Sequence, residues 1–272
     1  MYTVLGASGF IGSALTESLI GQGYNVYAPL GKGDDWLKAV LSCKLGHVFY
    51  CIGLTADFRS RPFETVEAHV CLLQKLLKEG QFDSITYLSS TRVYEGAGYT
   101  DESATLLVNP TSNGHLYNLS KMMGESLCIN SGRTAKIVRL SNVYHQQMDE
   151  RNFLSLVLKE AVNLGSVSFK TSSNSSKDFI SLQEVIRFLP MIALNGKSDI
   201  YNLATGENTT NAKIAQFLGD LGVDVYFGDD AAEWIFPQIN IERLQAEFDK
   251  PIGSLGADLT LLFNYLKLKA QL

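Results

Sequence analysis

The chain has 272 residues, with 23 basic and 28 acidic side chains and a net charge of −5. Apolar residues make up 46% and charged residues 19%, which is typical of a folded globular protein and excludes a disordered chain. The acidic balance disfavours nucleic-acid binding, and no apolar run approaches the roughly 20 residues that span a bilayer. The four cysteines form no C-x-x-C pair, and no charged leader precedes an apolar block at the N-terminus, so we expect a cytoplasmic location.

Short apolar runs alternate with amphipathic stretches over the first half of the chain. The expected elements, in chain order, are a strand at 2–5, a helix at 11–21, strands at 25–30 and 47–52, a helix at 65–78, a strand at 84–89, a helix at 116–129 and a strand at 135–140. Residues 48–52 are continuously apolar, as a strand buried on both faces requires. The alternation predicts an α/β fold of the Rossmann type, a doubly wound parallel sheet with helices on both sides.

The pattern changes after about residue 143. The expected elements are a helix at 152–163, a strand at 166–169, a polar Ser/Asn loop at 171–177, an extended segment at 178–180, a helix ending near 194, a strand at 200–203, a helix at 212–221, a strand at 224–227, and helices near 241–248 and 258–268. No linker or repeat separates these elements from the first half. They predict a smaller mixed α/β part packed against the sheet.

The first strand and first helix are joined by Gly-x-x-Gly-x-x-Gly at residues 6–12. The first glycine permits a tight turn, the second lets backbone approach a pyrophosphate, and the third lets the helix pack closely on the strand. The N-terminus of the helix then offers free N–H groups to phosphate. Its position between a strand and an amphipathic helix predicts a dinucleotide-binding turn.

The end of the second strand normally carries the group that selects the cofactor. Residues 27–34 have no acid at the strand end that could bond a ribose 2′-hydroxyl. Lys32 follows closely, either as a partner of a 2′-phosphate or as a solvated loop lysine. NADP is therefore slightly favoured over NAD.

Tyr117 and Lys121 form a Tyr-x-x-x-Lys pair at the start of an expected helix, where a spacing of four residues places both side chains on one face. A hydride leaving a carbinol carbon needs a base for the hydroxyl proton, and the reverse reaction needs an acid. Free tyrosine has a pKa of about 10, and a nearby lysine ammonium lowers it by stabilising the phenolate. The pair is a candidate acid–base site.

Ser89 and Ser90 end a strand at the carboxyl edge of the expected sheet, where ligands bind in open α/β folds. A serine hydroxyl there can orient the reacting oxygen of a substrate toward Tyr117. For either serine taken alone, a turn that terminates the strand is the alternative.

Together these motifs resemble the extended short-chain dehydrogenase/reductases, and within them the nucleotide-sugar epimerase, dehydratase and reductase group. The resemblance is carried by the glycine turn, by Leu-Ser-Ser-x-x-Val-Tyr at 88–94 and by Tyr-x-x-Ser-Lys-x-x-x-Glu at 117–125. Similar segments at 139–144 (Arg-x-x-Asn-Val-Tyr), 177–180 (Lys-Asp-Phe-Ile) and 201–206 (Tyr-Asn-Leu-Ala-Thr-Gly) extend it over nearly the whole chain, in order.

The resemblance implies roles for particular residues. Tyr117 would be the acid–base group, Lys121 its modulator, and Ser90, three positions before Val93, the partner of the substrate hydroxyl. The residues expected to bind NAD(P)(H) are Gly6, Ser8, Gly9, Phe10, Ile11, Gly12, Lys32, Gly53, Leu88, Tyr117, Lys121 and Leu140. Those expected to bind a nucleotide-sugar substrate are Thr55, Ser90, Thr91, Arg92, Asn142 and Lys177, with Lys177 on the diphosphate.

The chain also departs from the family pattern. Lys177 replaces an arginine and keeps the charge without the bidentate fork. His69 stands where an asparagine is usual. The favoured interpretation is a histidine on the face of the helix that takes no part in catalysis. His145 replaces a glycine and either reaches the sugar pocket or caps a turn.

One departure bears on the reaction. Arg92 follows Thr91, where 4,6-dehydratases of the family have Asp-Glu and enzymes that epimerise C3 and C5 have a cysteine. Because arginine cannot act as a base at neutral pH, we expect hydride transfer at one sugar carbon, either C4 epimerisation or keto-sugar reduction. For Arg92 itself, an ion-pair role is favoured over binding of an acidic sugar such as a uronate. A catalytically inactive NAD(P)-binding scaffold or sensor is the alternative function, which the presence of Ser90, Tyr117 and Lys121 disfavours.

The expected domain division is a Rossmann domain at 1–145, with a returning segment at about 178–204, and a substrate-binding domain at 146–177 and 205–272. Helices at about 65–78 and 116–129 would form the four-helix interface of a homodimer, as is common in the family. The expected partners are a nucleotide sugar and a second copy of the chain, with no metal, nucleic acid or membrane.

Overall fold

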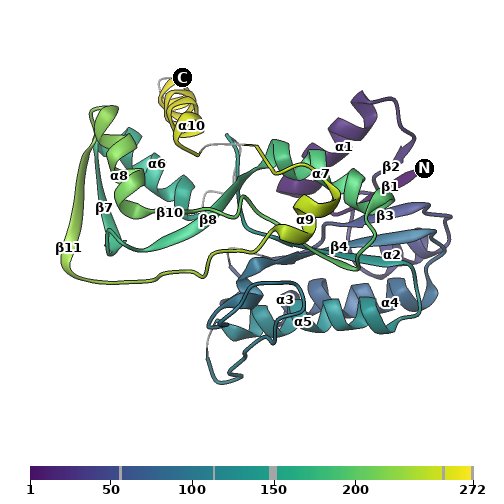
Figure 1. Cartoon of the computed structure of the whole chain (residues 1–272). Helices are drawn as coiled ribbons and strands as arrows, with labels where there is room; N and C mark the ends of the chain where they lie inside the picture. Colours follow the sequence, from purple (N-terminus) through teal and green to yellow (C-terminus); the bar gives the residue numbers. More distant parts are fainter. Residues whose placement is uncertain (55–56, 113, 147–151, 253–254, 271–272) are drawn as a thin grey trace.

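Six parallel strands form the central sheet of the structure, a computed structural model that describes every residue except 55–56, 113, 147–151, 253–254 and 271–272 (Figure 1). Their order is β2-β1-β3-β4-β5-β9. The strands are β1 (Tyr2–Leu5), β2 (Val26–Tyr27), β3 (His47–Tyr50), β4 (Ser84–Ser90), β5 (Ala135–Leu140) and β9 (Ile200–Leu203). Because β2 and β3 lie on opposite sides of β1, the strand order reverses there, and ligands of open α/β sheets bind at such a point.

Helices cover both faces of this sheet, as the alternating pattern predicts. Helices α1 (Phe10–Gly21) and α7 (Leu182–Asn195) lie on one face, and α4 (Leu72–Glu79) and α5 (His115–Asn130) lie on the other (Figure 1). Strand β3 contributes Phe49 to the first core and Tyr50 to the second, so it is buried on both sides. The predicted Rossmann-type fold is confirmed.

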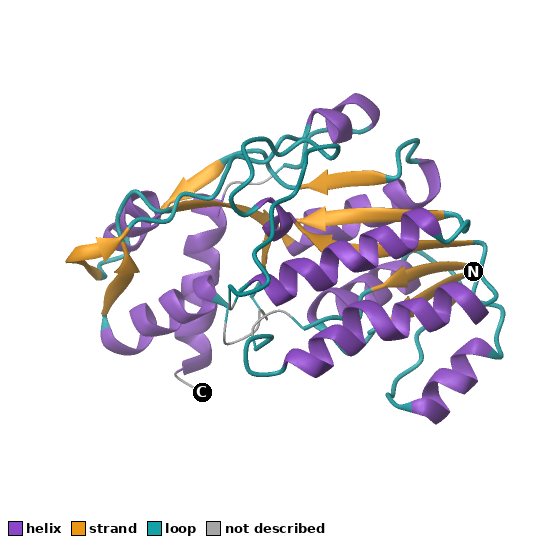
Figure 2. Cartoon of the chain, turned by 90° about the horizontal axis from the view of Figure 1, so that it is seen from below, coloured by secondary structure: helices purple, strands orange, loops and turns teal. Residues whose placement is uncertain are grey.

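A second lobe lies at one end of the sheet, and Figure 2 shows the two lobes side by side. It has a three-stranded sheet of β6 (Asn142–Tyr144), β8 (Ser176–Ser181) and β10 (Asn208–Thr210), and a pair of β7 (Ser166–Thr171) and β11 (Asp224–Ala232). Its helices are α6 (Phe153–Leu164), α8 (Asn211–Asp220) and α10 (Leu255–Ala270), which share one hydrophobic core with β7. The short helix α9 (Glu242–Glu247) packs back against β9. Within the described residues, no helix is both long and apolar enough to cross a membrane.

Two strand predictions were wrong. The segment expected as a strand at 25–30 pairs only at Val26–Tyr27, because Pro29 lacks an N–H donor and glycines follow at 31 and 33. The polar loop expected at 171–177 is short, since β7 runs to Thr171 and β8 begins at Ser176. Ser176 pairs antiparallel with Thr210, so backbone hydrogen bonds stabilise a strand whose side chains are polar.

Two helical features were also missed. The helix expected at 65–78 contains a π-helical turn, Glu67–Cys71, between α3 (Pro62–Val66) and α4. Such turns are rare and occur often at functional sites, and this one carries His69 into the interior. Helix α2 (Asp34–Leu41) is only two turns long, with Leu37 and Val40 as its buried residues, which is too short for a clear periodic signal.

Candidate active site

The turn between β1 and α1 lies at the point where the strand order reverses. Gly6 has a φ of +85°, and a Cβ on it would lie 2.9 Å from the carbonyl carbon of Cys51 at the end of β3. A Cβ on Gly12 would overlap the carbonyl oxygen of Gly6. Gly9 is the N-cap of α1, and no side chain caps the first N–H groups of this twelve-residue helix. The turn therefore fits a dinucleotide pyrophosphate.

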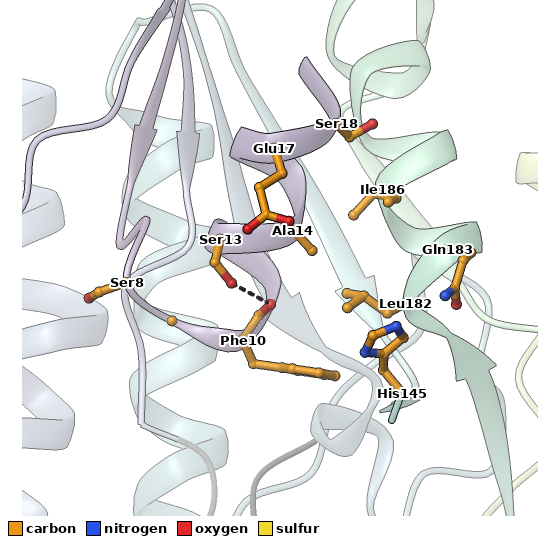
Figure 3. Close-up of a pocket in the computed structure, with 11 residues that line it drawn as sticks. Ser8, Phe10, Ser13, Ala14, Glu17, Ser18, His145, Leu182, Gln183 and Ile186 are labelled. Atoms are coloured by element: carbon orange, nitrogen blue, oxygen red, sulfur yellow. Dashed lines mark hydrogen bonds between the residues drawn. The ribbon is translucent and has the colours of Figure 1, made fainter. Parts of the chain in front are cut away.

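A cavity of about 580 Å³ lies beside this turn, between α1, as far along as Ser18, and the start of α7 (Figure 3). Ser8, Gly9 and Phe10 line it on the turn side, and Ile11 and Gly12 continue the first turn of α1. His145 also lines this cavity, with its ring centroid 6.4 Å from that of Phe10. The structure thus places His145 against the glycine turn, a position that neither interpretation of this residue had given.

Tyr117 lies in the first turn of α5 and is 5% exposed. Burial raises the pKa of its phenol, while a hydrogen bond with Ser90 and the charge of Arg92 lower it. Ser90 ends β4, and its hydroxyl also accepts the Arg92 N–H at 3.2 Å. The structure therefore brings the predicted serine and tyrosine together at the carboxyl edge of the sheet.

Lys121 lies one turn further along α5 and is 4% exposed. Its ammonium donates to the Leu88 carbonyl at 2.8 Å and lies 6.0 Å from the centroid of the Tyr117 ring. Burial lowers the pKa of Lys121 to about 7, although nearby Glu125 raises it. A Cβ on Gly53 would lie 3.5 Å from the ammonium, so the loop after β3 closes over this lysine.

His69 is completely buried beside the same groups. The Leu54 N–H donates to its Nε2 at 3.2 Å, which assigns the ring proton to Nδ1, 2.8 Å from the Ser120 hydroxyl. That hydroxyl donates to the carbonyl of Tyr117 at 2.8 Å. Burial, together with the charge of Lys121, lowers the pKa of His69 to about 2, so the ring is neutral. His69 thus connects the loop after β3 to the backbone of α5.

Ser89 points to the other side of β4 and is used in a buried network. Its hydroxyl donates to Glu125 at 2.5 Å, and Glu125 accepts two bonds from Arg139, at 3.0 and 2.7 Å. Arg139 also donates to the hydroxyl of Tyr94 at 2.6 Å. This network fixes β4, β5 and α5 together beneath the site and leaves Ser90 as the serine facing Tyr117.

Thr91 and Arg92 follow Ser90 in a short 3-10 turn, Thr91–Tyr94. Thr91 is 4% exposed, and a nitrogen of the Arg92 guanidinium pairs with Glu95 at 3.2 Å. The predicted ion pair of Arg92 is therefore present. The charge of Arg92 also lowers the pKa of Lys177, which burial brings to about 8.

Lys177 lies in β8, beside a second cavity of about 480 Å³ between α6 and β7. Phe153, Phe169 and Trp234 line this cavity, and the Lys177 ammonium lies 3.8 Å from the Phe153 ring centroid. Asn142, in β6, donates to the carbonyl of Asp178 at 2.8 Å and so lies next to Lys177. Two predicted substrate ligands thus meet at the boundary of the second lobe.

The remaining predicted residues are more dispersed. Leu88 and Leu140 are buried near the carboxyl ends of β4 and β5, where Ser90 and Leu140 are register partners. Lys32 is exposed in the loop after the edge strand β2. Strands β1 and β3 separate β2 from β4, the strand whose end lies beside Tyr117. Thr55 lies outside the described residues.

Four further residues reach the site that no sequence pattern predicted there: Phe58, Arg59, Glu95 and Asn118. Phe58 is 3% exposed, and its ring centroid lies 5.0 Å from that of Tyr117. Asn118 is buried and donates to Glu95 at 3.2 Å. Only Asn118 and Glu95 could have been predicted at the site, because they lie close in sequence to Tyr117 and Arg92. The other two come from a loop after β3 that has no motif.

The reversal of strand order, the glycine turn and the Ser–Tyr–Lys arrangement define the chain as an extended short-chain dehydrogenase/reductase. The model of the NAD dependent epimerase/dehydratase family matches residues 2–204, and the chain belongs to this family. The resemblance predicted from the sequence motifs is confirmed.

Relatives and solved structures agree with this assignment. A Methanocaldococcus jannaschii protein named "Putative UDP-glucose 4-epimerase" is 24% identical over 205 residues, 71% of this chain and 66% of that protein, just under two thirds of its length. Among solved structures, MoeE5 in complex with UDP-glucuronic acid and NAD has a TM-score of 0.82 at 21% identity, covering 98% of this chain and 99% of that one. RMD from Pseudomonas aeruginosa, complexed with NADPH, has a TM-score of 0.82 at 19% identity, covering 99% and 100%. The similarity to these structures shows the shared fold.

Proposed function

We propose that the protein is an NAD(P)-dependent oxidoreductase or epimerase that acts on a nucleotide-diphosphate sugar by hydride transfer at one sugar carbon. The observation that carries the proposal is the meeting of Ser90, Tyr117 and Lys121 beside the glycine turn, with a buried phenol hydrogen-bonded to a serine. An inactive scaffold would have no use for this arrangement.

A bound NAD(P)(H) would supply the hydride acceptor and donor for the sugar carbon. Gly6, Gly9 and the N-terminus of α1 would hold its pyrophosphate, and Lys121 would hold its nicotinamide ribose. Tyr117 removes the proton of the sugar hydroxyl while the hydride leaves, and it returns a proton when the ketone is reduced. Ser90 donates a hydrogen bond to the same oxygen and orients it.

The second cavity supports a position for the nucleotide. Its aromatic walls, Phe153, Phe169 and Trp234, suit a nucleobase, which binds by stacking on aromatic faces. Lys177 lies at this cavity and toward Arg92, where it would meet the diphosphate. A bound diphosphate would raise the pKa of Lys177 again, because an anion stabilises the ammonium. The substrate would thus span from this cavity to Tyr117.

Two features bear on the choice of reaction and cofactor. Arg92 follows Thr91 and is paired with Glu95, so this turn presents no free carboxyl pair for eliminating water, and epimerisation or reduction is favoured over dehydration. Lys32 is exposed in the loop where a 2′-phosphate would lie, which keeps NADP slightly favoured over NAD. We also propose a homodimer formed through α4 and α5, as the sequence resemblance implies.

The test is to follow reduced-nicotinamide absorbance with NADPH and NADH against a panel of nucleotide sugars and their 4-keto forms, and to examine the same samples by NMR. A substrate-dependent fall in absorbance identifies a reductase, and a changed sugar with constant absorbance identifies an epimerase. Tyr117→Phe should reduce turnover at least about 100-fold, the lower range for acid–base catalysis. Tyr99→Phe, at a side chain that is 79% exposed, is the matched control and should leave turnover unchanged. Full turnover in Tyr117→Phe would refute the mechanism.

A further inference from the structure

The Arg92 guanidinium is held in place but only partly satisfied. It pairs with Glu95 at 3.2 Å, and Glu95 is held in turn by the buried amide of Asn118, the residue after Tyr117. The Nε of Arg92 is buried and has no hydrogen-bond partner among the described residues. Buried polar groups are almost always paired, so an unpaired donor beside a candidate substrate site points to a group that arrives with the ligand.

Cations outnumber acids around this guanidinium. A Cβ placed on Gly114 would lie 2.8 Å from a terminal nitrogen of Arg92 and 3.8 Å from one of Arg59. Lys177 is close enough for the charge of Arg92 to lower its pKa. In the described part of the chain, neither Arg59 nor Lys177 has an ion-pair partner, and Glu95 is the acid paired with Arg92. The surroundings of Arg92 therefore favour an anion.

We propose that Arg92, oriented by Glu95 and Asn118, binds a carboxylate on the sugar ring of the substrate, so that the preferred substrate is a nucleotide-diphosphate hexuronate. This inference rests on the proposed function and specifies its substrate class. The carboxylate of a hexuronate is attached to C5, the neighbour of the C4 carbon at which hydride transfer is proposed. A neutral hexose would offer hydroxyls but no negative charge to balance the excess of cations around Arg92.

The position of Arg92 favours a sugar carboxylate over the diphosphate. Its guanidinium carbon lies 5.4 Å from the centroid of the Phe58 ring, which itself lies 5.0 Å from the Tyr117 ring. Its backbone N–H bonds to Ser90, the partner of the reacting oxygen. Lys177, in contrast, packs on Phe153 at the cavity proposed for the nucleotide. Arg92 and Lys177 would thus bind different ends of the same substrate.

The test compares two ligands that differ only at C6, UDP-glucose and UDP-glucuronate, with the dTDP pair in parallel. Dissociation constants are measured by calorimetry on the full chain saturated with NAD+ or NADP+. We expect the uronate of at least one pair to bind about 30-fold more tightly or better, the range expected for a buried charge pair. Arg92→Gln should reduce this ratio to about three or less, and Arg92→Lys should retain part of it. Arg61→Gln, which removes an arginine with surface ion pairs to Asp57 and Glu64, is the control and should keep the ratio.

The outcomes separate this inference from the proposed function. Equal binding of hexose and uronate, or a preference that survives Arg92→Gln, overturns the role of Arg92 while leaving nucleotide-sugar binding intact. Failure of all four nucleotide sugars, and of free UDP, dTDP, GDP, ADP and CDP, to bind overturns the proposed function, and this inference with it. Should Arg92→Gln fail to fold, the ratio measured with Arg92→Lys decides, and an undiminished ratio counts against the proposal.

Discussion

Replacing Glu125 by glutamine should strongly destabilise the protein. Glu125 and Arg139 are buried, with side chains that are 5% and 4% exposed, and they form two charge-assisted hydrogen bonds. The substitution keeps the shape and still accepts the bond from Ser89, but it leaves the guanidinium of Arg139 buried without its counter-charge. Removing one partner of a buried ion pair costs about 3–5 kcal/mol. Since domains of ordinary stability unfold with about 5–15 kcal/mol, the variant should fold but with a much reduced margin.

The assay is urea-induced unfolding followed by the fluorescence of Trp36 and Trp234, which report on the two lobes. The double variant Glu125→Leu/Arg139→Met removes both charges, and it should recover most of the loss, because a buried pair can often be replaced by apolar residues at little cost. Asp35→Asn, in an exposed ion pair with Lys38, is the control and should change the midpoint within error. A loss below about 1 kcal/mol for Glu125→Gln, or an equal loss in the double variant, would refute the reasoning.

Three further outcomes are expected. Gly12→Ala should weaken NAD(P)(H) binding at least about tenfold, because the Cβ of the new alanine would overlap the carbonyl oxygen of Gly6. The measurement is a titration of cofactor fluorescence, and an unchanged affinity would contradict the close packing of the turn. Burial lowers the pKa of Lys121 to about 7, well below its value in the unfolded chain, so between pH 7 and pH 9 the unfolded chain binds more protons than the folded one. The unfolding free energy of the wild type, relative to that of Lys121→Met, should therefore rise by about 2 kcal/mol from pH 7 to pH 9. A difference that does not change with pH would contradict this prediction. The chain should have a mass of twice 29.9 kDa by light scattering, and Met123→Asp, on the exposed face of α5, should reduce that mass to one chain; a monomeric wild type would exclude the dimer.

Most of the fold could be predicted because its signals are local. Strands β1, β5 and β9 have the predicted bounds, since each is short and has apolar residues at most of its positions. In the second lobe, β7 and β11 begin at the predicted residues but run further, whereas β8 was expected only as an extended segment at 178–180 and β10 was not predicted. The polar residues of β8 form a strand because β10, more than 25 positions away, supplies its backbone partners. Such partners lie outside any local window of sequence.

Some residues of the candidate site could likewise be predicted from the sequence, and others could not. Tyr117, Lys121 and Ser90 were found because their chemistry has a fixed spacing in one helix and one strand end. His69 was noticed only as a departure from a family pattern, and the π-helical turn that directs it inward has no sequence signature of its own. Phe58 and Arg59 reach the site from a loop after β3, and only the folded arrangement shows that they neighbour Tyr117 and Arg92.

A comparison of Arg139, which is buried, with Arg92, which is partly buried, shows how one arginine supports the fold and the other is left for a ligand. Arg139 has bidentate contact with Glu125 and a further bond to Tyr94, so its charge is satisfied entirely by the chain. Arg92 lies a few residues beyond the neighbouring strand, yet it has one acidic partner and a buried donor without one. Because a buried hydrogen-bond donor without a partner is costly, the Nε of Arg92 calls for water or a ligand to accept its hydrogen bond. The contrast explains why Arg139 holds β4, β5 and α5 in place, whereas Arg92 is available to a substrate at the same edge of the sheet.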